Sequence, residues 1–427
     1  MKHALRAILC LLALLLASAS HAQIGRQFPS ERKVVKDPVT GTLLTFLTSR
    51  PHRDSKIYPT HPQWTVDGKW VVFRSAMANG EAMAVNEQTG QIVQVSEGGY
   101  TGMLNLSTHA MKLYFMRAAQ GKAVDIVEVD LARLFADVAS GQVKPADVYQ
   151  RLCGTVPAQI EAGGDMALDA GDEWVYFRVG AQEAARHLSA GMKTEAAFGP
   201  RGMGAGPAGI ARMNLRSGEV RHVVSVPFQV GHIQANPWNP GEIVFCWETG
   251  GKSPQRTWTV LADGSGLRPL YPESPYEWVT HEAVISKDEV AMALVGHRTG
   301  AAKDSDWGPA GTREKPSGLA IVNLRTRAMT IAGQTASGSG LWHVHGSADG
   351  RWAVGDDFSR SVYLIDRRSH EMMLLTTGHK TSAADHPHPT FSADGTRIEI
   401  QSAMLSADGR TMNICIVPVP QAWLERP

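Results

Sequence analysis

Trp64-Thr65-Val66-Asp67-Gly68-Lys69-Trp70-Val71-Val72-Phe73 is the first copy of a pattern that recurs along the whole chain. A polar turn, often Asp-Gly, is followed by a short run of aromatic and β-branched residues, and both features are typical of a β-hairpin. Six further copies begin near Leu106, Met166, Pro237, Val284, Gly346 and Phe391. The chain is therefore expected to consist of seven similar units.

Most units continue with a second pair of strands around another turn, as in residues 210–224 and 362–375. Four strands per unit is typical of a propeller blade. The seven units thus predict an all-β fold, a seven-bladed β-propeller. Residues 189–207 and 300–316 are expected to be inserted loops, and a short helix is expected near 131–138.

The two ends of the repeat are complementary. The last unit ends one strand short, after residues 413–419, whereas residues 41–48 form a spare strand near the start. If the N-terminal strand completes the last blade, the ring closes and neither strand leaves an exposed edge. No boundary suggests a second domain, so residues 23–427 are expected to form one propeller domain.

The first 22 residues have the pattern of a cleavable secretory signal. Lys2 and Arg6 precede an apolar run over residues 7–17, and Ser20 and Ala22 are small residues suited to a cleavage site. The apolar run is shorter than the roughly 20 residues of a membrane helix. We expect cleavage after Ala22 and a periplasmic or secreted protein without membrane insertion.

Composition argues against a nucleic-acid partner. Loss of Lys2 and Arg6 with the signal changes the formal net charge from +1 to −1, which leaves no generally basic surface. An anionic partner must therefore be bound by a few placed groups. Cys153, Cys246 and Cys415 remain at spacings that suit neither a disulfide framework nor a zinc motif, so they are expected to be small buried residues.

Four histidines occupy the same position in the repeat. His61, His281, His343 and His388 each lie six residues before the turn residue of their unit. The strand that leads into this turn is the innermost strand of a blade, so the four imidazoles are expected to face a common channel. A single inward histidine is usually a hydrogen-bonded lining residue, whereas four in register favour a site. His232 lies one residue out of this register.

Two of these histidines have a second histidine two residues away. His345 follows His343, and His386 precedes His388 in the segment His386-Pro387-His388-Pro389. Residues i and i+2 of a strand share a face, and the prolines keep the segment out of a helix. Because imidazole is a common ligand of divalent transition metals, two histidines of one strand and one of the neighbouring blade predict a three-nitrogen metal site. His345 is expected to be a structural polar residue on the neighbouring face.

The chain resembles the oligogalacturonate lyases of polysaccharide lyase family 22. The resemblance extends over nearly all of the chain after the signal and includes the segment Tyr58-Pro59-Thr60. Its most specific segments are Val230-Gly-His-Ile233, Phe245-Cys-Trp-Glu248, Arg256-Thr-Trp258, Thr280-His-Glu282, Trp342-His-Val344 and His386-Pro-His-Pro389. It implies an enzyme that cleaves short pectin fragments by β-elimination.

The resemblance also implies roles for individual residues. His343, His386 and His388 correspond to the metal ligands, with manganese as the usual ion, and His281 corresponds to the catalytic base. Arg256 corresponds to an arginine near the reacting sugar.

Further residues follow from the same comparison and from the register of the repeat. His232, His61 and Tyr58 are the expected substrate-binding residues. The chain departs from the family at Ala383, where a glutamine is the fourth ligand, and at Trp247, where the family has a histidine. His379, Asp385 or a water are the candidates for the missing ligand.

The chemistry explains why such residues are needed. Removal of the C5 proton of a 4-linked uronide is hindered by the adjacent negative carboxylate, which a divalent metal and a guanidinium can neutralise. An imidazole that is neutral near pH 7 can then accept the proton. A small acidic oligosaccharide is therefore the expected partner.

Three alternatives remain. A non-catalytic periplasmic propeller of the TolB type, which would bind a protein or a glycan, shares the repeat but does not require registered histidines. The propeller of a serine peptidase is disfavoured because no Gly-x-Ser-x-Gly motif occurs. A lyase for a different uronate-containing polysaccharide is compatible with the departures at Ala383 and Trp247.

Overall fold

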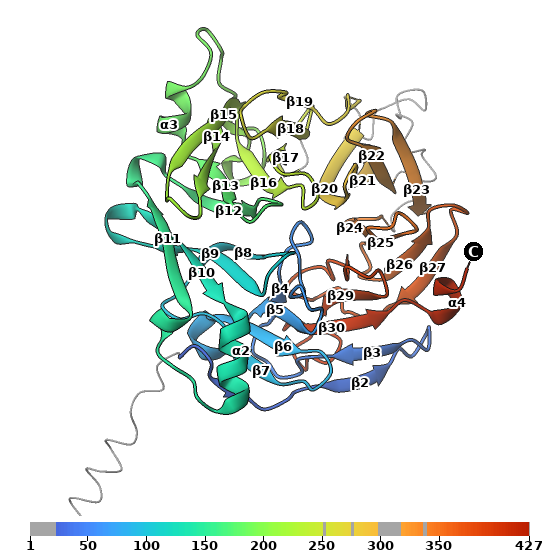
Figure 1. Ribbon diagram of the computed structural model, residues 1–427. Helices are drawn as coiled ribbons and strands as arrows, with labels where there is room; N and C mark the ends of the chain where they lie inside the picture. The colour runs from blue at the N-terminus through green and yellow to red at the C-terminus, as the bar shows by residue number, and fades with distance from the viewer. Residues whose placement is uncertain (1–22, 251–252, 275–276, 298–316, 336–339, 427) are drawn as a thin grey trace, which may run out of the picture.

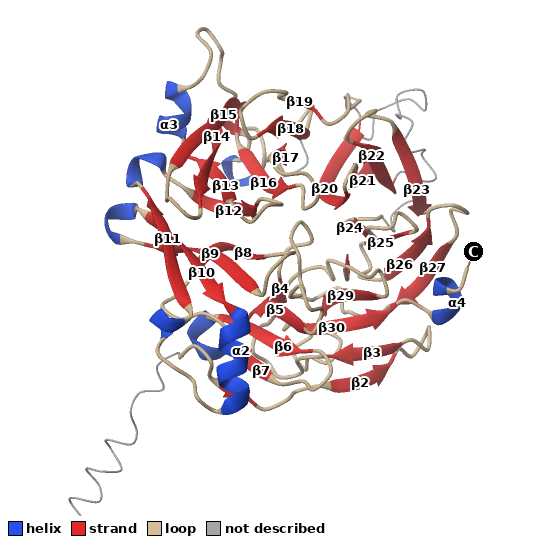
Figure 2. Ribbon diagram, viewed as in Figure 1, coloured by secondary structure: helices blue, strands red, loops and turns tan. Residues whose placement is uncertain are grey.

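The computed structural model describes residues 23–250, 253–274, 277–297, 317–335 and 340–426. Seven antiparallel sheets surround a central axis (Figure 1), and the few helices lie at the periphery (Figure 2). The predicted seven-bladed β-propeller is therefore confirmed. The expected signal segment and the expected loop at 300–316 lie outside the described residues. No helix within those ranges is long and apolar enough to cross a membrane.

Five blades are four-stranded sheets whose strands follow one another in the chain. They consist of β8 (Thr101–Leu106), β9 (Lys112–Ala118), β10 (Val124–Asp130) and β11 (Gln150–Val156); β12 (Gly163–Leu168), β13 (Trp174–Val179), β14 (Ala205–Asn214) and β15 (Val220–Phe228); β16 (Val230–Ala235), β17 (Glu242–Trp247), β18 (Thr257–Leu261) and β19 (Arg268–Pro269); β20 (Glu277–Ser286), β21 (Glu289–His297), β22 (Ser317–Asn323) and β23 (Met329–Thr335); β24 (Val344–Gly346), β25 (Trp352–Asp356), β26 (Val362–Asp366) and β27 (Met372–Thr376). The expected loop at 189–207 precedes and overlaps the start of β14.

The first and the last blade each have five strands. The first contains β4 (Ser55–Lys56), β5 (Trp70–Arg74), β6 (Ala82–Asn86) and β7 (Ile92–Gln94), with β1 (Gln27–Phe28) at its edge. The last contains β28 (Thr390–Phe391), β29 (Arg397–Ser402), β30 (Asn413–Pro418), β3 (Leu43–Phe46) and β2 (Lys33–Lys36).

The N-terminal strand closes the ring as predicted. β3 pairs with β30, with Thr45 opposite Ile416 and Phe46 opposite Cys415. The closure is more extensive than the sequence indicated, because β2 adds a further strand outside β3. Ring closure thus pairs residues from opposite ends of the chain.

The recurring turns have a local chemical basis. In the first copy the Thr65 hydroxyl donates to the Asp67 carboxylate at 2.6 Å, and Gly68 has φ +67°. Ser347 with Asp349 and Ser392 with Asp394 repeat the same 2.6 Å contact. A glycine is needed after the aspartate because L side chains rarely adopt this left-handed conformation.

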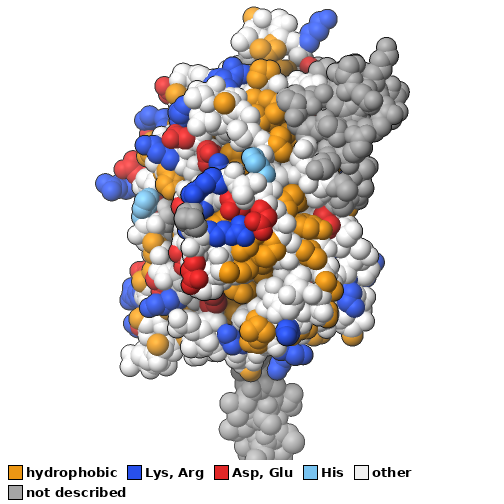
Figure 3. Space-filling view, turned by 90° about the vertical axis from the view of Figure 1, so that its right-hand side faces the viewer, with side chains coloured by type: hydrophobic (Ala, Val, Ile, Leu, Met, Phe, Trp, Pro, Cys, Tyr) orange, Lys and Arg blue, Asp and Glu red, His pale blue; other side chains and the backbone are white. Residues whose placement is uncertain are grey.

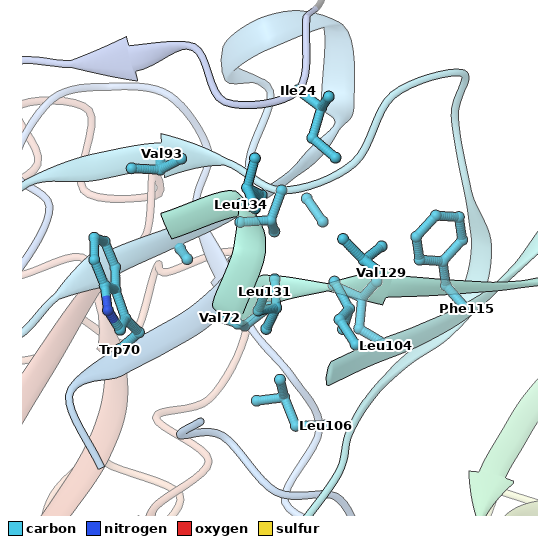
Figure 4. Packing of buried hydrophobic residues seen from close by; sticks show 14 of the residues in the cluster. Ile24, Trp70, Val72, Val93, Leu104, Leu106, Phe115, Val129, Leu131 and Leu134 are labelled. Atoms are coloured by element: carbon cyan, nitrogen blue, oxygen red, sulfur yellow. The ribbon is translucent and has the colours of Figure 1, made fainter. Parts of the chain in front are cut away.

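Buried hydrophobic residues form clusters that each join two neighbouring blades. The cluster between the first two blades also includes helix α2 (Leu131–Ser140), whose Leu131 and Leu134 pack toward the sheets (Figure 4). Trp70 stacks on Phe135 with ring centroids 4.1 Å apart. Burial of each such side chain stabilises the fold by about 1.5–3 kcal/mol. The predicted short helix is thereby confirmed.

Other features agree with the composition. Cys153, Cys246 and Cys415 are free and buried. The remaining α-helices of the described chain, α3 (Ala181–Arg186) and α4 (Gln421–Leu424), are short. Acidic and basic side chains are interspersed on the face shown in Figure 3, as the formal net charge near zero indicates.

Candidate active site

Three histidines enter the centre of the ring from the same kind of β-bulge. His232, His281 and His388 have left-handed backbones, with φ of +48°, +52° and +53°. Each histidine lies in a β-bulge, at which two residues of the innermost strand face a single residue of the next strand. Such a backbone costs on the order of 1–3 kcal/mol in a residue other than glycine and is often found at functional sites.

The structure places His232 in the same register as His281. Residues 232–233 lie opposite Phe245, just as residues 281–282 lie opposite Met292. The chain from the histidine to the residue opposite it is two residues longer in this blade, with twelve residues between His232 and Phe245 and ten between His281 and Met292. Counting residues back from the turn therefore put His232 out of register in the sequence. In the structure it occupies the same position in its blade as His281.

Asp356 is a fully buried carboxylate that holds two of the predicted metal ligands. Its oxygens lie 3.3 Å from Nδ1 of His343 and 3.4 Å from Nδ1 of His386. The backbone amide of His343 donates to the same carboxylate at 2.8 Å. Burial alone would raise the pKa of Asp356, but the two histidines lower it well below its usual range.

His388 completes the histidine cluster. Its ring centroid lies 3.8 Å from that of His343, and the His386 ring lies 5.0 Å from His343. Nε2 of His388 is 3.3 Å from the half-exposed carboxylate of Asp385. Burial lowers the pKa of His343 to about 3, so this imidazole is neutral at pH 7 and free to bind a cation.

These residues fit a divalent metal. His343, His386 and Asp356 can each bring one ligand atom within 4.8 Å of the others. Nδ1 of His386 and Nε2 of His388 are buried, and within the described residues neither has a partner in hydrogen-bond geometry. A cation would satisfy these nitrogens, and a mixed set of imidazoles and carboxylates is compatible with manganese.

The position of the family's glutamine supplies no ligand. Ala383 is buried in a small apolar cluster with Ala403 and Met412. His379 is not a replacement, because its two ring nitrogens contact the hydroxyls of Ser402 at 2.8 Å and Thr376 at 3.2 Å. Of the residues considered as substitutes, Asp385 is the one beside the histidine cluster.

His281 lies next to this cluster. Its ring centroid is 4.1 Å from that of His343 and 4.6 Å from that of Trp342. Nδ1 is 2.6 Å from the Tyr58 hydroxyl, whereas the buried Nε2 has no hydrogen-bond partner in the described chain. Burial and the nearby histidines hold the pKa of His281 well below its usual value. The imidazole is therefore neutral, as a proton acceptor must be.

Arg256 lies in a network of charges with Glu282, Glu248 and His232. Its guanidinium is 2% exposed and donates from Nε to Glu282 at 2.9 Å, with Glu248 3.6 Å from Nη2. His232 bridges the same carboxylates, 3.1 Å from Glu282 and 3.5 Å from Glu248. Burial would raise the pKa of Glu282, but Arg256 and His232 lower it to about 2. Since the arginine already balances these carboxylates, the nearby group of His232, Cys246 and Glu282 is a poor cation site.

Other predicted residues lie around the centre in different environments. Tyr58 is central, with ring contacts to His232 and His388 at 5.2 Å. His61 lines a cavity of about 110 Å³ with Tyr58 and His232, but its ring nitrogens already contact the Thr60 hydroxyl at 2.7 Å and the Met166 carbonyl at 2.8 Å. With His345 it lines a channel cavity of about 430 Å³.

Trp247, which replaces the family's histidine, also has a structural environment. Its indole donates to the Gly204 carbonyl at 3.0 Å, and its ring stacks on Phe228. Trp247 is buried at the interface between two blades. At this position the chain therefore has a packing residue in place of the family's histidine.

Asp385 is a candidate that the sequence offered, but Asp356, Glu282 and Glu248 were not predicted as site residues. Asp356 is on the second strand of its blade, across the hairpin from His343. Glu282 and Glu248 lie within segments that carry the resemblance to oligogalacturonate lyases. Acidic residues are also common in turns and at sheet edges, so the sequence alone did not mark these two as site residues. The signal that could have identified Asp356 is an acidic residue at the end of the buried run 352–356.

Fold and site together define a seven-bladed propeller with a histidine and carboxylate centre at its axis. No family model and no curated protein sequence matches this chain. Solved structures do match. One is an oligogalacturonate lyase in complex with manganese, with a TM-score of 0.73 and 17% identity over 94% of this chain and 100% of the other.

A second oligogalacturonate lyase structure, from Vibrio parahaemolyticus, has a TM-score of 0.72 and 16% identity, with the same coverage. The WD40 repeats of RRP9 match with a TM-score of 0.53 and 11% identity, over 91% of this chain and 100% of the other. The resemblance to oligogalacturonate lyases inferred from the motifs is thus confirmed at the level of the fold.

Proposed function

We propose that this protein is a metal-dependent lyase that cleaves a 4-linked uronide within an acidic oligosaccharide by β-elimination. The observation that carries the proposal is the convergence of His343, His386 and His388 around Asp356, beside a neutral His281. A structural propeller has no need for buried imidazole nitrogens, such as Nδ1 of His386 and Nε2 of His388, that lack a partner in hydrogen-bond geometry among the described residues. The similar structures named as oligogalacturonate lyases, one with manganese, support the same reading.

His343, His386 and His388 would hold the metal, with Asp356 orienting His343 through its Nδ1 atom. The bound metal would neutralise the uronate carboxylate and so acidify the C5 hydrogen. Nε2 of His281 accepts that proton, since it is the ring atom without a hydrogen-bond partner among the described residues. Arg256 holds Glu282 and His232 in place from its buried position.

The direct test is cleavage by the purified protein. Oligogalacturonides are the first substrates, because the similar structures are lyases for them, and glucuronate and mannuronate oligomers complete the panel. Product is followed by the ultraviolet absorbance of the 4,5-unsaturated uronide, with Mn²⁺ or with a chelator. Chelator-sensitive formation of this product supports the proposal. Absence of product from every uronide, or stoichiometric metal absent from the protein, would favour a binding propeller instead.

We also propose that the protein acts after export. The N-terminal pattern of Lys2, Arg6 and the apolar run supports cleavage after Ala22. The mass of the mature chain recovered from a periplasmic extract would show whether residues 1–22 are removed. An uncleaved chain in the cytoplasm would contradict this part of the proposal.

A further inference from the structure

The turn between β25 and β26, residues 357–361, lies at the same end of the ring as the histidine centre. β24 and β25 are antiparallel, and the Trp342 amide donates to the Asp356 carbonyl at 2.7 Å, so the end of β25 lies beside the start of β24. Asp357 fixes the turn, because its carboxylate accepts from the Ser361 amide at 2.8 Å. This turn therefore borders the proposed metal ligands.

Phe358 packs against the histidine centre from this turn. Its ring centroid lies 5.1 Å from that of Trp342 and 6.4 Å from that of His386, yet the residue is 40% exposed. An aromatic ring that packs on one side and meets solvent on the other provides an apolar surface with a fixed position. Phe358 thus offers a place for the face of a sugar ring beside the histidines.

Arg360, two residues further along the same turn, has a guanidinium without a partner among the described residues. Its Nε and Nη1 are buried and unbonded. Nη2 is also unbonded but is not buried, so it is the nitrogen that a ligand can reach. A structural arginine of this protein is different, since Arg325 contacts Glu242 at 2.6 Å. The half-buried Arg360 is therefore not explained by the stability of the fold.

The charge of Arg360 acts within the histidine centre. Burial lowers the pKa of Arg360, and the carboxylates of Asp356 and Asp385 oppose this shift, so both are near enough to act on its charge. The guanidinium stays protonated in spite of burial. Asp356 and Asp385 themselves face histidines of the cluster. A partly desolvated cation without a paired anion attracts an incoming carboxylate strongly.

We propose that Arg360 binds the carboxylate of a second uronate, the sugar next to the one that is cleaved, and that Phe358 packs on the face of that sugar. The inference rests on the proposed lyase function and deepens it, because it makes adjacent uronates a requirement for efficient binding. Neither residue lies in a segment that carries the resemblance to oligogalacturonate lyases.

The position of the turn favours the neighbouring sugar over the reacting one. In the proposed function the metal holds the reacting carboxylate and His281 faces the C5 hydrogen. Phe358 has ring contacts with Trp342 and His386 but none with His281 in the described part of the chain. The turn is therefore displaced from the proposed base, on the side where a longer substrate continues.

Binding of trisaccharides tests the inference apart from catalysis. Trimers of 4-linked galacturonate, glucuronate and mannuronate are titrated calorimetrically into the Mn²⁺-loaded full chain. The tightest binder is compared with its derivative in which both outer carboxylates are methyl esters. The wild type should bind the free acid about 10–100-fold more tightly, the usual worth of a hydrogen bond to a charged group. Arg360→Gln should bind both trimers as weakly as the wild type binds the diester.

Two further variants control for charge and for folding. Arg360→Lys keeps the charge and should retain part of the preference for the free acid. Arg216→Gln, in the exposed turn between β14 and β15, should behave as wild type. Mn²⁺ affinity should be unchanged in Arg360→Gln. Weaker Mn²⁺ binding, equal losses with both trimers, or an unchanged preference in this variant would overturn the inference.

Cleavage assays with the same trimers separate the inference from the proposed function. Arg360→Gln should raise KM for the free acid with little change in kcat, because it removes an interaction made equally in the ground state and the transition state. Cleavage that ignores the outer carboxylates would overturn the inference and leave the lyase function standing. An Arg360-dependent preference in binding without cleavage of any trimer would overturn the lyase function alone. No binding of any trimer would overturn both.

Discussion

Asp356 accepts a hydrogen bond from the backbone amide of His343 at 2.8 Å and approaches Nδ1 of the same residue at 3.3 Å. One buried carboxylate thus fixes both the backbone and the ring of a residue on the neighbouring strand. A partner of this kind orients a metal-ligating histidine and raises its basicity.

Replacement of this carboxylate should weaken metal binding. We expect Asp356→Asn to reduce Mn²⁺ affinity by about 10–100-fold, the usual effect of losing such a partner. Calorimetric titration of the purified protein measures this directly. Asp366→Asn, at the end of β26 in the same blade, is the matched control. Unchanged affinity in Asp356→Asn would mean that Asp356 does not support the metal ligands.

Removal of the proposed base should separate catalysis from metal binding. His281→Ala is expected to lower turnover by at least about 10²-fold and to leave the bound metal content as in the wild type. His281 contacts the cluster through its ring but is not among the residues whose ligand atoms gather around Asp356. Elemental analysis and steady-state kinetics on one preparation check both points. Metal loss in this variant would reassign His281 as a ligand.

The pairing of Glu282 with Arg256 should contribute strongly to stability. Both side chains are buried, and Glu282→Gln removes the negative charge that faces the guanidinium at 2.9 Å. A loss of about 3–5 kcal/mol in the free energy of unfolding is expected. Urea denaturation at pH 7 measures it, and a loss below 1 kcal/mol would show that Glu248 alone balances the arginine.

The same carboxylate should make the fold sensitive to acid. The pKa of Glu282 is lowered to about 2, below its ordinary 4.5. Its contribution is therefore present above pH 4.5 and is lost as the pH falls toward 2, because the unfolded chain binds the proton first. The wild type should lose stability over this range more steeply than Glu282→Gln. Parallel curves for the two proteins would contradict the assignment.

Glu399 should have the opposite dependence. It is fully buried, its two oxygens have no hydrogen-bond partner within the described residues, and burial raises its pKa to about 8, an effect that nearby Lys56 opposes. The folded protein therefore holds this proton up to about pH 8, whereas the unfolded chain releases it near pH 4.5. Stability from this group is complete below pH 4.5 and declines toward pH 8. Melting temperatures of Glu399→Gln between pH 5 and 8 should vary less than those of the wild type.

The repeat made the fold predictable because its signals are local. Contacts such as that between Thr65 and Asp67 form within one turn, so each copy can be recognised independently of the others. The additional strands β1 and β2 were not predicted, since each depends on a sheet edge built by distant residues. Ring closure by β3 was predictable because a missing strand and a spare strand are both visible in the sequence.

The site was predictable where it follows the repeat and was missed where it crosses strands. His281, His343 and His388 lie in one register of the sequence, and the structure brings them together. His232 was displaced in the count by a longer turn. Asp356 depends on the pairing of β24 with β25, which places it beside His343. His61 has the expected register but directs its ring into hydrogen bonds with the fold.

The pairing of β3 with β30 sets the order in which the protein can mature. Thr45 cannot pair with Ile416 until the end of the chain has been made. One edge of β3 therefore stays unpaired through almost the whole of synthesis, while β2 can pair with its other edge. The histidines at the centre belong to blades whose relative positions are fixed only when β3 pairs with β30 and closes the ring. Competence to bind an ion at the axis should consequently arise late and all at once, when the chain's final strand arrives.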